Sequence, residues 1–236
     1  MRIAVLFAFL LTTPAIAKPL VVHVTVALCD NASQGIVPVP AAIGDGNDPR
    51  TNLYWGASYG VKSWLKREKW TIEKAKSPHA AILERIIARK TIAGREVVLT
   101  ADAWRGNRIR DAITTFLEQA SGLGDGAHAD VVAYIGHDGL MEFSVTPRFA
   151  RSAAPPPRSI VLACASHQYF GDHLLRAGST PLLWTNGLMA PEAYTLTAAI
   201  EAWVRTNDAA AVREAAAQAY QKYQKCGIKG ARRLFR

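Results

Sequence analysis

Two short apolar runs decide the fold of this 236-residue chain, VVAYIGH at residues 131–137 and SIVLAC at residues 159–164. Both are rich in β-branched residues and predict buried strands. Each ends in a side chain that can do chemistry, His137 in one case and Cys164 in the other. Because ligand-binding groups of open α/β folds gather at the carboxyl ends of parallel strands, we expect the imidazole and the thiol to meet there. Such a pair can serve as a thiol nucleophile and the base that activates it.

The rest of the chain alternates strands with helices. Residues 20–28, LVVHVTVAL, are apolar on both faces and predict a central strand. Residues 77–104 carry a helix-start signal at Ser77-Pro78, but a hairpin through Ala93-Gly94 is favoured. A short further strand is expected at 181–184, and helices are expected over 51–65, 106–121, 167–177, 191–205 and 208–225. This order predicts an α/β fold, a three-layer sandwich with a mostly parallel central sheet.

The N-terminal residues 1–17 read as a secretory signal peptide. Arg2 precedes the apolar stretch IAVLFAFLL, and Ala15-Ile16-Ala17 forms a small-x-small cleavage pattern. The stretch is too short for a comfortable membrane span. We therefore expect an exported protein, periplasmic or secreted from a bacterium, in which residues 18–236 form a single α/β domain.

Charge gives little evidence of a partner. The formal net charge is +9, from 28 basic and 19 acidic residues. The basic residues are scattered, and no basic stripe with interleaved aromatic residues indicates nucleic-acid binding. A basic exported protein can still favour anionic surfaces or acidic partners, and the sequence leaves the oligomeric state open.

The three cysteines leave one thiol unpaired in an oxidising compartment. Cys29 closes the first expected strand and Cys226 follows the last expected helix, so a bridge between them would leave Cys164 free. Alternatively, Cys29 is a small buried apolar residue. Sequence alone leaves both possibilities open.

The two histidine and cysteine blocks resemble those of the caspase-like cysteine peptidases, which include caspases, metacaspases, legumains, gingipains and separases. YIGHDG at 134–139 is similar to the histidine block, and IVLACAS at 160–166 is similar to the cysteine block. The resemblance implies a dyad of His137 and Cys164 in the family's caspase-like α/β sandwich. Asp138 stands where the family usually has a glycine directly after the histidine, so Gly139 and the amide of Cys164 are the expected oxyanion-hole donors.

The resemblance also implies an activity and a substrate. It predicts a cysteine endopeptidase that acts on a peptide or protein and needs neither a metal nor another cofactor. Asp30 matches a family position that shapes the substrate pocket, and an exposed carboxylate there would favour cleavage after arginine or lysine. Asp30 could equally cap its own loop through Asn31 and Ser33. Asn186, after the last expected strand, is a further candidate for substrate binding.

A second interpretation belongs to another class of protein. A histidine at a strand end and a cysteine in an apolar strand are each commonly structural when taken alone. The alternative is a catalytically inactive caspase-like envelope protein that binds a peptide or glycan at the same edge of the sheet. Labelling of Cys164 by an electrophilic peptide would distinguish the two.

Overall fold

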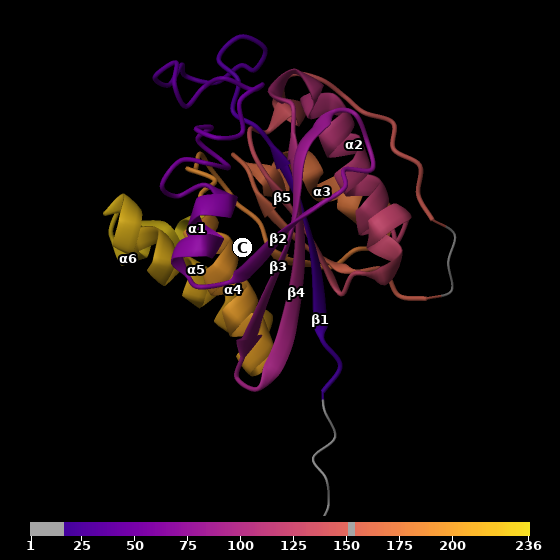
Figure 1. The fold of residues 1–236 in the computed structure, drawn as a ribbon. Coiled ribbons are helices and arrows are strands. Elements are labelled where there is room, and N and C mark those ends of the chain that lie inside the picture. Colours follow the sequence, from indigo (N-terminus) through magenta and orange to yellow (C-terminus); the bar gives the residue numbers. More distant parts are fainter. Residues whose placement is uncertain (1–16, 151–153) are drawn as a thin grey trace, which may run out of the picture.

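A seven-stranded sheet with helices on both of its faces forms the centre of the protein (Figure 1). The structure, a computed structural model, describes residues 17–150 and 154–236, so nearly all of the predicted signal peptide lies outside the described residues. The strands are β1 (Leu20–Ala27), β2 (Thr71–Ala75), β3 (Ile82–Ile92), β4 (Arg95–Trp104), β5 (Val131–Ile135), β6 (Arg158–Leu162) and β7 (Pro181–Leu183). Their order in the sheet is β2-β3-β4-β1-β5-β6-β7.

The sheet is mixed and mostly parallel. Strands β4, β1, β5, β6 and β7 each run parallel to the next in that order, whereas β2, β3 and β4 are joined antiparallel. The expected α/β class and mostly parallel sheet are therefore confirmed. The carboxyl end of β1 and the long loop that follows it lie at the top of Figure 1, which marks the edge shared by the parallel strands.

Helices cover the two faces unequally. They are α1 (Val61–Arg67), α2 (Ile109–Ala120), α3 (Ser166–Ala177), α4 (Ala193–Thr206), α5 (Ala209–Gln224) and α6 (Ile228–Leu234). Figure 1 shows α2 and α3 on one face and α1, α4, α5 and α6 on the other. Alternate residues of β1 serve the two layers. Val22, Val24 and Val26 join the core that includes Trp64 and Tyr194, whereas the opposite face carries the buried polar residues His23 and Thr25. Strand β1 is therefore buried on both sides but strongly apolar on only one.

The expected hairpin is confirmed, and an expected helix is shorter than predicted. Strands β3 and β4 turn through Ala93 and Gly94, both with positive φ. The helix expected over 51–65 begins only at Val61. Asn52 accounts for the difference, since its side chain accepts from the N–H of Cys29 at 3.1 Å and donates to the Cys29 carbonyl at 2.8 Å. An amide side chain that binds backbone in this way competes with the helix.

Two short elements, β2 and α6, were not expected from the sequence. Strand β2 is largely exposed and lacks a buried alternating pattern. Helix α6 leads into a β-bridge between Phe235 and Thr185. The backbone of Trp184 exchanges two hydrogen bonds with that of Arg236, at 3.0 and 3.1 Å. The segment after α6 thus adds a further pairing partner just beyond β7.

All three cysteines are free thiols. Cys29 is buried and Cys226 is exposed, so the bridge considered from the sequence is not formed and Cys29 behaves as a buried apolar residue. Burial raises the pKa of the Cys29 thiol to about 11. At neutral pH this sulfur stays protonated and unreactive.

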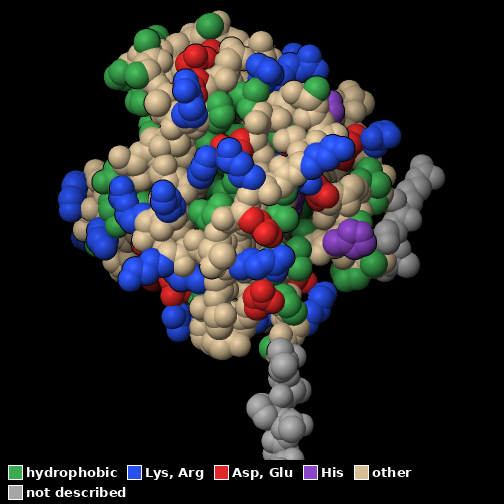
Figure 2. Space-filling model, viewed as in Figure 1, with side chains coloured by type: hydrophobic (Ala, Val, Ile, Leu, Met, Phe, Trp, Pro, Cys, Tyr) green, Lys and Arg blue, Asp and Glu red, His purple; other side chains and the backbone are tan. Residues whose placement is uncertain are grey.

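The surface carries charge of both signs. On the face that Figure 2 shows, Lys and Arg side chains are scattered and interleaved with acidic ones. Within residues 17–150 and 154–236, no helix is long and apolar enough to cross a membrane.

Candidate active site

The ends of β5 and β6 bring the two main candidate residues to the same edge of the sheet. The strands are parallel, and Ile135 pairs with Leu162. His137 and Cys164 each lie two positions beyond this pair, and neighbouring strands are only about 4.8 Å apart. Both side chains line one cavity. The structure therefore places the imidazole and the thiol that the sequence singles out along the same cavity.

The backbone at His137 is held from inside the protein. Gly136 has a φ of +155°, and a Cβ there would lie 2.9 Å from the carbonyl oxygen of Ala27, so a side chain is excluded. The carbonyl of His137 accepts from the Tyr134 hydroxyl at 2.8 Å and from the Gly139 N–H at 3.1 Å. The N–H that was expected to hold an oxyanion is thus engaged within its own loop.

A carboxylate orients the His137 ring. The Nε2 atom lies 2.6 Å from Oε1 of Glu142, and the same oxygen accepts from the N–H of Gly35 at 2.9 Å. A carboxylate bound to one ring nitrogen fixes the tautomer and leaves the other nitrogen for proton transfer. Because Glu142 takes Nε2, Nδ1 is the nitrogen left to exchange a proton with a thiol.

Cys164 lies in a sharp connection from β6 to α3. The next residue, Ala165, has a φ of +46°, a left-handed conformation that costs an L-residue about 1–2 kcal/mol. Ser166 and Thr185 brace the turn, since the N–H of each donates to the hydroxyl of the other at 3.2 and 2.9 Å. The Cys164 sulfur accepts from the N–H of Met189 at 3.4 Å. Backbone strain of this kind is typical of functional sites.

The cavity beside these two residues is small and mostly apolar. Its volume is about 290 Å³. Its walls come from the loop after β1, from the segment after His137 and from the loop after β7. The apolar side chains among them belong to Ile36, Val37, Tyr54, Met141, Leu188, Met189 and Pro191. Three connections that are distant in sequence thus close around one thiol.

Asp138 is a buried carboxyl group directly after the candidate histidine. Its Oδ1 accepts from the N–H of Leu140 at 3.0 Å, whereas its Oδ2 is buried without a hydrogen-bond partner. Burial raises the pKa of Asp138 to about 7, the negative charge of Glu142 adds to the increase, and the bond from Leu140 opposes it. The group is therefore partly protonated near neutral pH.

The other two candidate residues lie away from this cavity. Asp30 is buried, and its carboxylate accepts from the N–H of Ala32 at 3.1 Å and the hydroxyl of Ser33 at 2.6 Å. It therefore caps its own loop, and the exposed carboxylate that would select a basic substrate is absent at this position. Asn186 is exposed and donates to the carbonyl of Arg233 at 3.1 Å, which ties the loop after β7 to α6.

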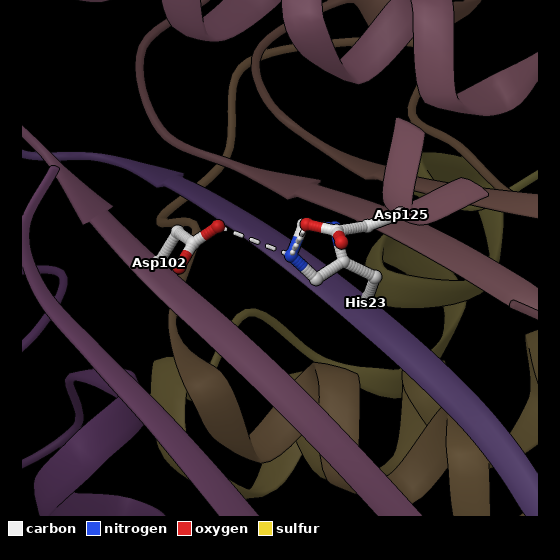
Figure 3. A group of neighbouring side chains, drawn as sticks. All are labelled: His23, Asp102 and Asp125. Carbon is white, nitrogen blue, oxygen red and sulfur yellow. Dashed lines mark hydrogen bonds and ion pairs between the residues drawn. The ribbon is translucent and has the colours of Figure 1, made fainter. Parts of the chain in front are cut away.

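A second group of polar residues, two of them buried and one exposed, lies away from the cavity. Figure 3 shows His23 on β1 facing Asp102 on β4, with Asp125 beside them. The three offer ligand atoms within 4.8 Å of one another. However, Arg85 donates to Asp102 at 2.6 Å and to Asp125 at 2.7 Å. The Arg85 guanidinium already forms an ion pair with each carboxylate. This group, called the buried charge cluster after its buried members His23 and Asp102, is therefore an ion-pair network and a poor site for a metal cation.

Glu142 and the apolar walls of the cavity were not found from the sequence. Glu142 follows His137 by five positions on an irregular segment, where no periodicity relates the two. Val37 and Leu188 belong to loops that meet only in the folded chain. A carboxylate close after a candidate base was the one available signal, and it does not indicate which way the side chain turns.

Comparison of the chain with models of protein families, with curated proteins and with solved structures finds no match.

Proposed function

We propose that the protein is a caspase-like cysteine hydrolase that acts as an endopeptidase. We further propose that it is exported by means of residues 1–17. One observation carries the proposal. His137 and Cys164 follow adjacent parallel strands at equal offsets and line the same cavity. Thiol and imidazole at one solvent-reachable edge provide a nucleophile with its base. The likeness of the two sequence blocks to caspase-like peptidases supports the same assignment.

The proposed reaction needs only groups of the protein and water. Nδ1 of His137 takes the proton of the Cys164 thiol, and the sulfur attacks the carbonyl carbon of the substrate. His137 then gives this proton to the leaving amine as the C–N bond breaks, which leaves a thioester on Cys164. A water molecule, deprotonated by His137, cleaves the thioester and regenerates the thiol.

The negative oxygen formed during attack requires N–H donors. The amide of Cys164 is one candidate, and Gly139 is the other. Since the Gly139 N–H donates to the His137 carbonyl at 3.1 Å, it must exchange that bond for the substrate oxygen. Removal of one oxyanion-hole donor typically costs a factor of about 10²–10³ in rate, so this exchange would govern how active the site is.

The engagement of the Gly139 N–H also favours the second candidate function, that of a binding protein without catalytic activity. Asp138 replaces the glycine that usually follows the histidine in caspase-like peptidases, and Gly139 is engaged. A protein with this edge but without an oxyanion hole would bind a peptide or glycan without cleaving it. The two functions make opposite predictions for covalent labelling.

The test is labelling of the whole protein with peptide acyloxymethyl ketones, followed by mass spectrometry. An enzyme takes up one probe at Cys164, the Cys164→Ala variant takes up none, and His137→Ala reacts at least about 100-fold more slowly. Cys226→Ala is the matched control, because that thiol is exposed, and it labels like the wild type. If iodoacetamide alkylates Cys226 while no peptide probe modifies Cys164, the enzyme is excluded and the binding protein is favoured.

A further inference from the structure

Exposed apolar side chains gather around the cavity beside Cys164. In the part of the chain that the structure describes, four large hydrophobic side chains are exposed, those of Val37, Met141, Leu175 and Leu188. Three of them, Val37, Met141 and Leu188, line this cavity. Val37 and Leu188 are 87% and 78% exposed. Apolar surface concentrated at one opening is typical of a binding site rather than of ordinary surface variation.

The interior of the cavity is also apolar. Ile36, Met189 and Pro191 continue the apolar lining inward. Among the described residues, no aspartate, glutamate, lysine or arginine lines the cavity. The nearby Glu142 carboxylate is bound to His137 and to Gly35. A charged substrate side chain would therefore find no ionic partner among the residues that line the cavity, whereas an apolar side chain would bury apolar surface there.

The cavity volume limits the size of the occupant. At about 290 Å³, it lies at the lower end of the range for sites that enclose a whole small molecule, which is roughly 300–1,000 Å³. It therefore suits a single large side chain beside the reacting carbonyl. Its rim is made of loops after β1 and β7, so the rest of an extended peptide can leave the site along the sheet edge.

We propose that this cavity receives a large apolar side chain of a peptide substrate, such as leucine, methionine or phenylalanine, next to the bond that Cys164 attacks. The inference rests on the proposed function and replaces the preference for basic residues that Asp30 suggested. Asp30 lines a different hollow together with Asn31, Asp45 and Asn107. Burial of such a side chain favours it over a charged one by at least about tenfold in kcat/KM.

The first test compares peptide acyloxymethyl ketones that differ only at the residue next to the reactive carbonyl. We expect probes with leucine, methionine or phenylalanine to label Cys164 at least about tenfold faster than those with arginine, lysine or aspartate. Leu188→Asp should reduce labelling by the leucine probe about tenfold and increase labelling by the arginine probe. Leu175→Asp is the matched control, because Leu175 is 79% exposed and lies on α3 outside the cavity, and it should label like the wild type.

The second test separates this inference from the proposed function. Binding of unreactive leucyl and arginyl peptide amides to Cys164→Ala is measured by calorimetry, and we expect the leucyl peptide to bind more tightly. If Cys164 reacts fastest with the arginine probe, the hydrolase proposal stands and the apolar preference is wrong. If no probe labels Cys164 but the leucyl peptide binds, the hydrolase fails while the apolar site holds. If the leucyl peptide does not bind more tightly than the arginyl one, the apolar site is overturned.

Discussion

The protein uses a histidine paired with a carboxylate in two different regions. In the buried charge cluster, Nε2 of His23 lies 3.1 Å from Asp102. At the sheet edge, Nε2 of His137 lies 2.6 Å from Glu142. The pairs are similar in chemistry, yet His23 lies within β1 whereas His137 lies two residues beyond β5. Position relative to the strand end, rather than residue type, decides which histidine lines a cavity.

Neighbouring charges separate the two regions further. Burial alone would raise the pKa of Asp102, but hydrogen bonds from Arg85 and His23 outweigh it and hold that pKa below its usual range. Among the described residues, no cation stabilises the Asp138 carboxylate beside His137, and burial raises its pKa to about 7. Asp102 in the buried charge cluster is therefore held ionised by its partners, whereas the sheet edge retains a carboxyl group that can change protonation near neutral pH.

Disrupting the buried charge cluster should have the largest effect on stability. Arg85→Met leaves Asp102, which is 1% exposed, without its main ionic partner, and such a loss typically costs about 3–5 kcal/mol. Thermal unfolding monitored by circular dichroism should show a Tm lower by roughly 10 °C. Arg89→Met is the matched control, because Arg89 lies on the same strand, is half-exposed and forms only a 3.5 Å surface pair with Glu96. Equal Tm values for the two variants would contradict a stabilising role of the cluster.

Asp138 at the sheet edge should make the free energy of unfolding depend on pH. The folded pKa of Asp138, about 7, lies above the unfolded value of about 3.9. Its contribution to stability is therefore fully present below about pH 4 and is lost as pH rises through about 7. The loss is at most about 4 kcal/mol, and Asp138→Asn should remove it.

The measurement is the difference in urea unfolding free energy between Asp138→Asn and the wild type from pH 4 to pH 8. The variant should gain relative stability as pH rises. Asp45→Asn, a change at an exposed residue, serves as the control and should follow the wild type at every pH. A difference for Asp138→Asn that does not vary with pH would refute the assignment.

The smallest effect is expected from neutralising the carboxylate at the sheet edge. Glu142→Gln can still accept from Gly35 but no longer stabilises a positively charged His137. We expect labelling of Cys164 by a leucine probe to slow about tenfold, equivalent to about 1.4 kcal/mol, with a changed pH–rate profile and little change in unfolding free energy. Glu201→Gln, which disrupts an exposed pair with Arg205, should alter neither. A pH–rate profile identical to the wild type would mean that Glu142 does not orient the base.

Those parts of the fold that depend on local pattern were predictable from the sequence. Strands β1, β5 and β6 are short β-branched runs, and α2 is amphipathic. The segment before α1 was not predictable because the Asn52 side chain binds the backbone of Cys29, which is distant in sequence. Strand β2 escaped prediction because an exposed strand carries no buried alternating pattern.

The candidate site likewise has a part that could be predicted from the sequence and a part that could not. The shared edge of His137 and Cys164 follows from two parallel strands that end in chemically capable residues. Glu142, Val37 and Leu188 reach that edge from loops, whose paths depend on the whole fold. Asp30 shows the limit of prediction from sequence most clearly. It was expected to help form a substrate pocket, but its side chain turns back and accepts a hydrogen bond from Ser33.

The bridge between Phe235 and Thr185 has a practical consequence for handling the protein. An uncovered outer strand is a template for pairing with another molecule, and this segment occupies the border of the sheet beyond β7. Deleting residues 234–236 would release the backbone groups of Trp184, so shortened preparations should self-associate with rising concentration.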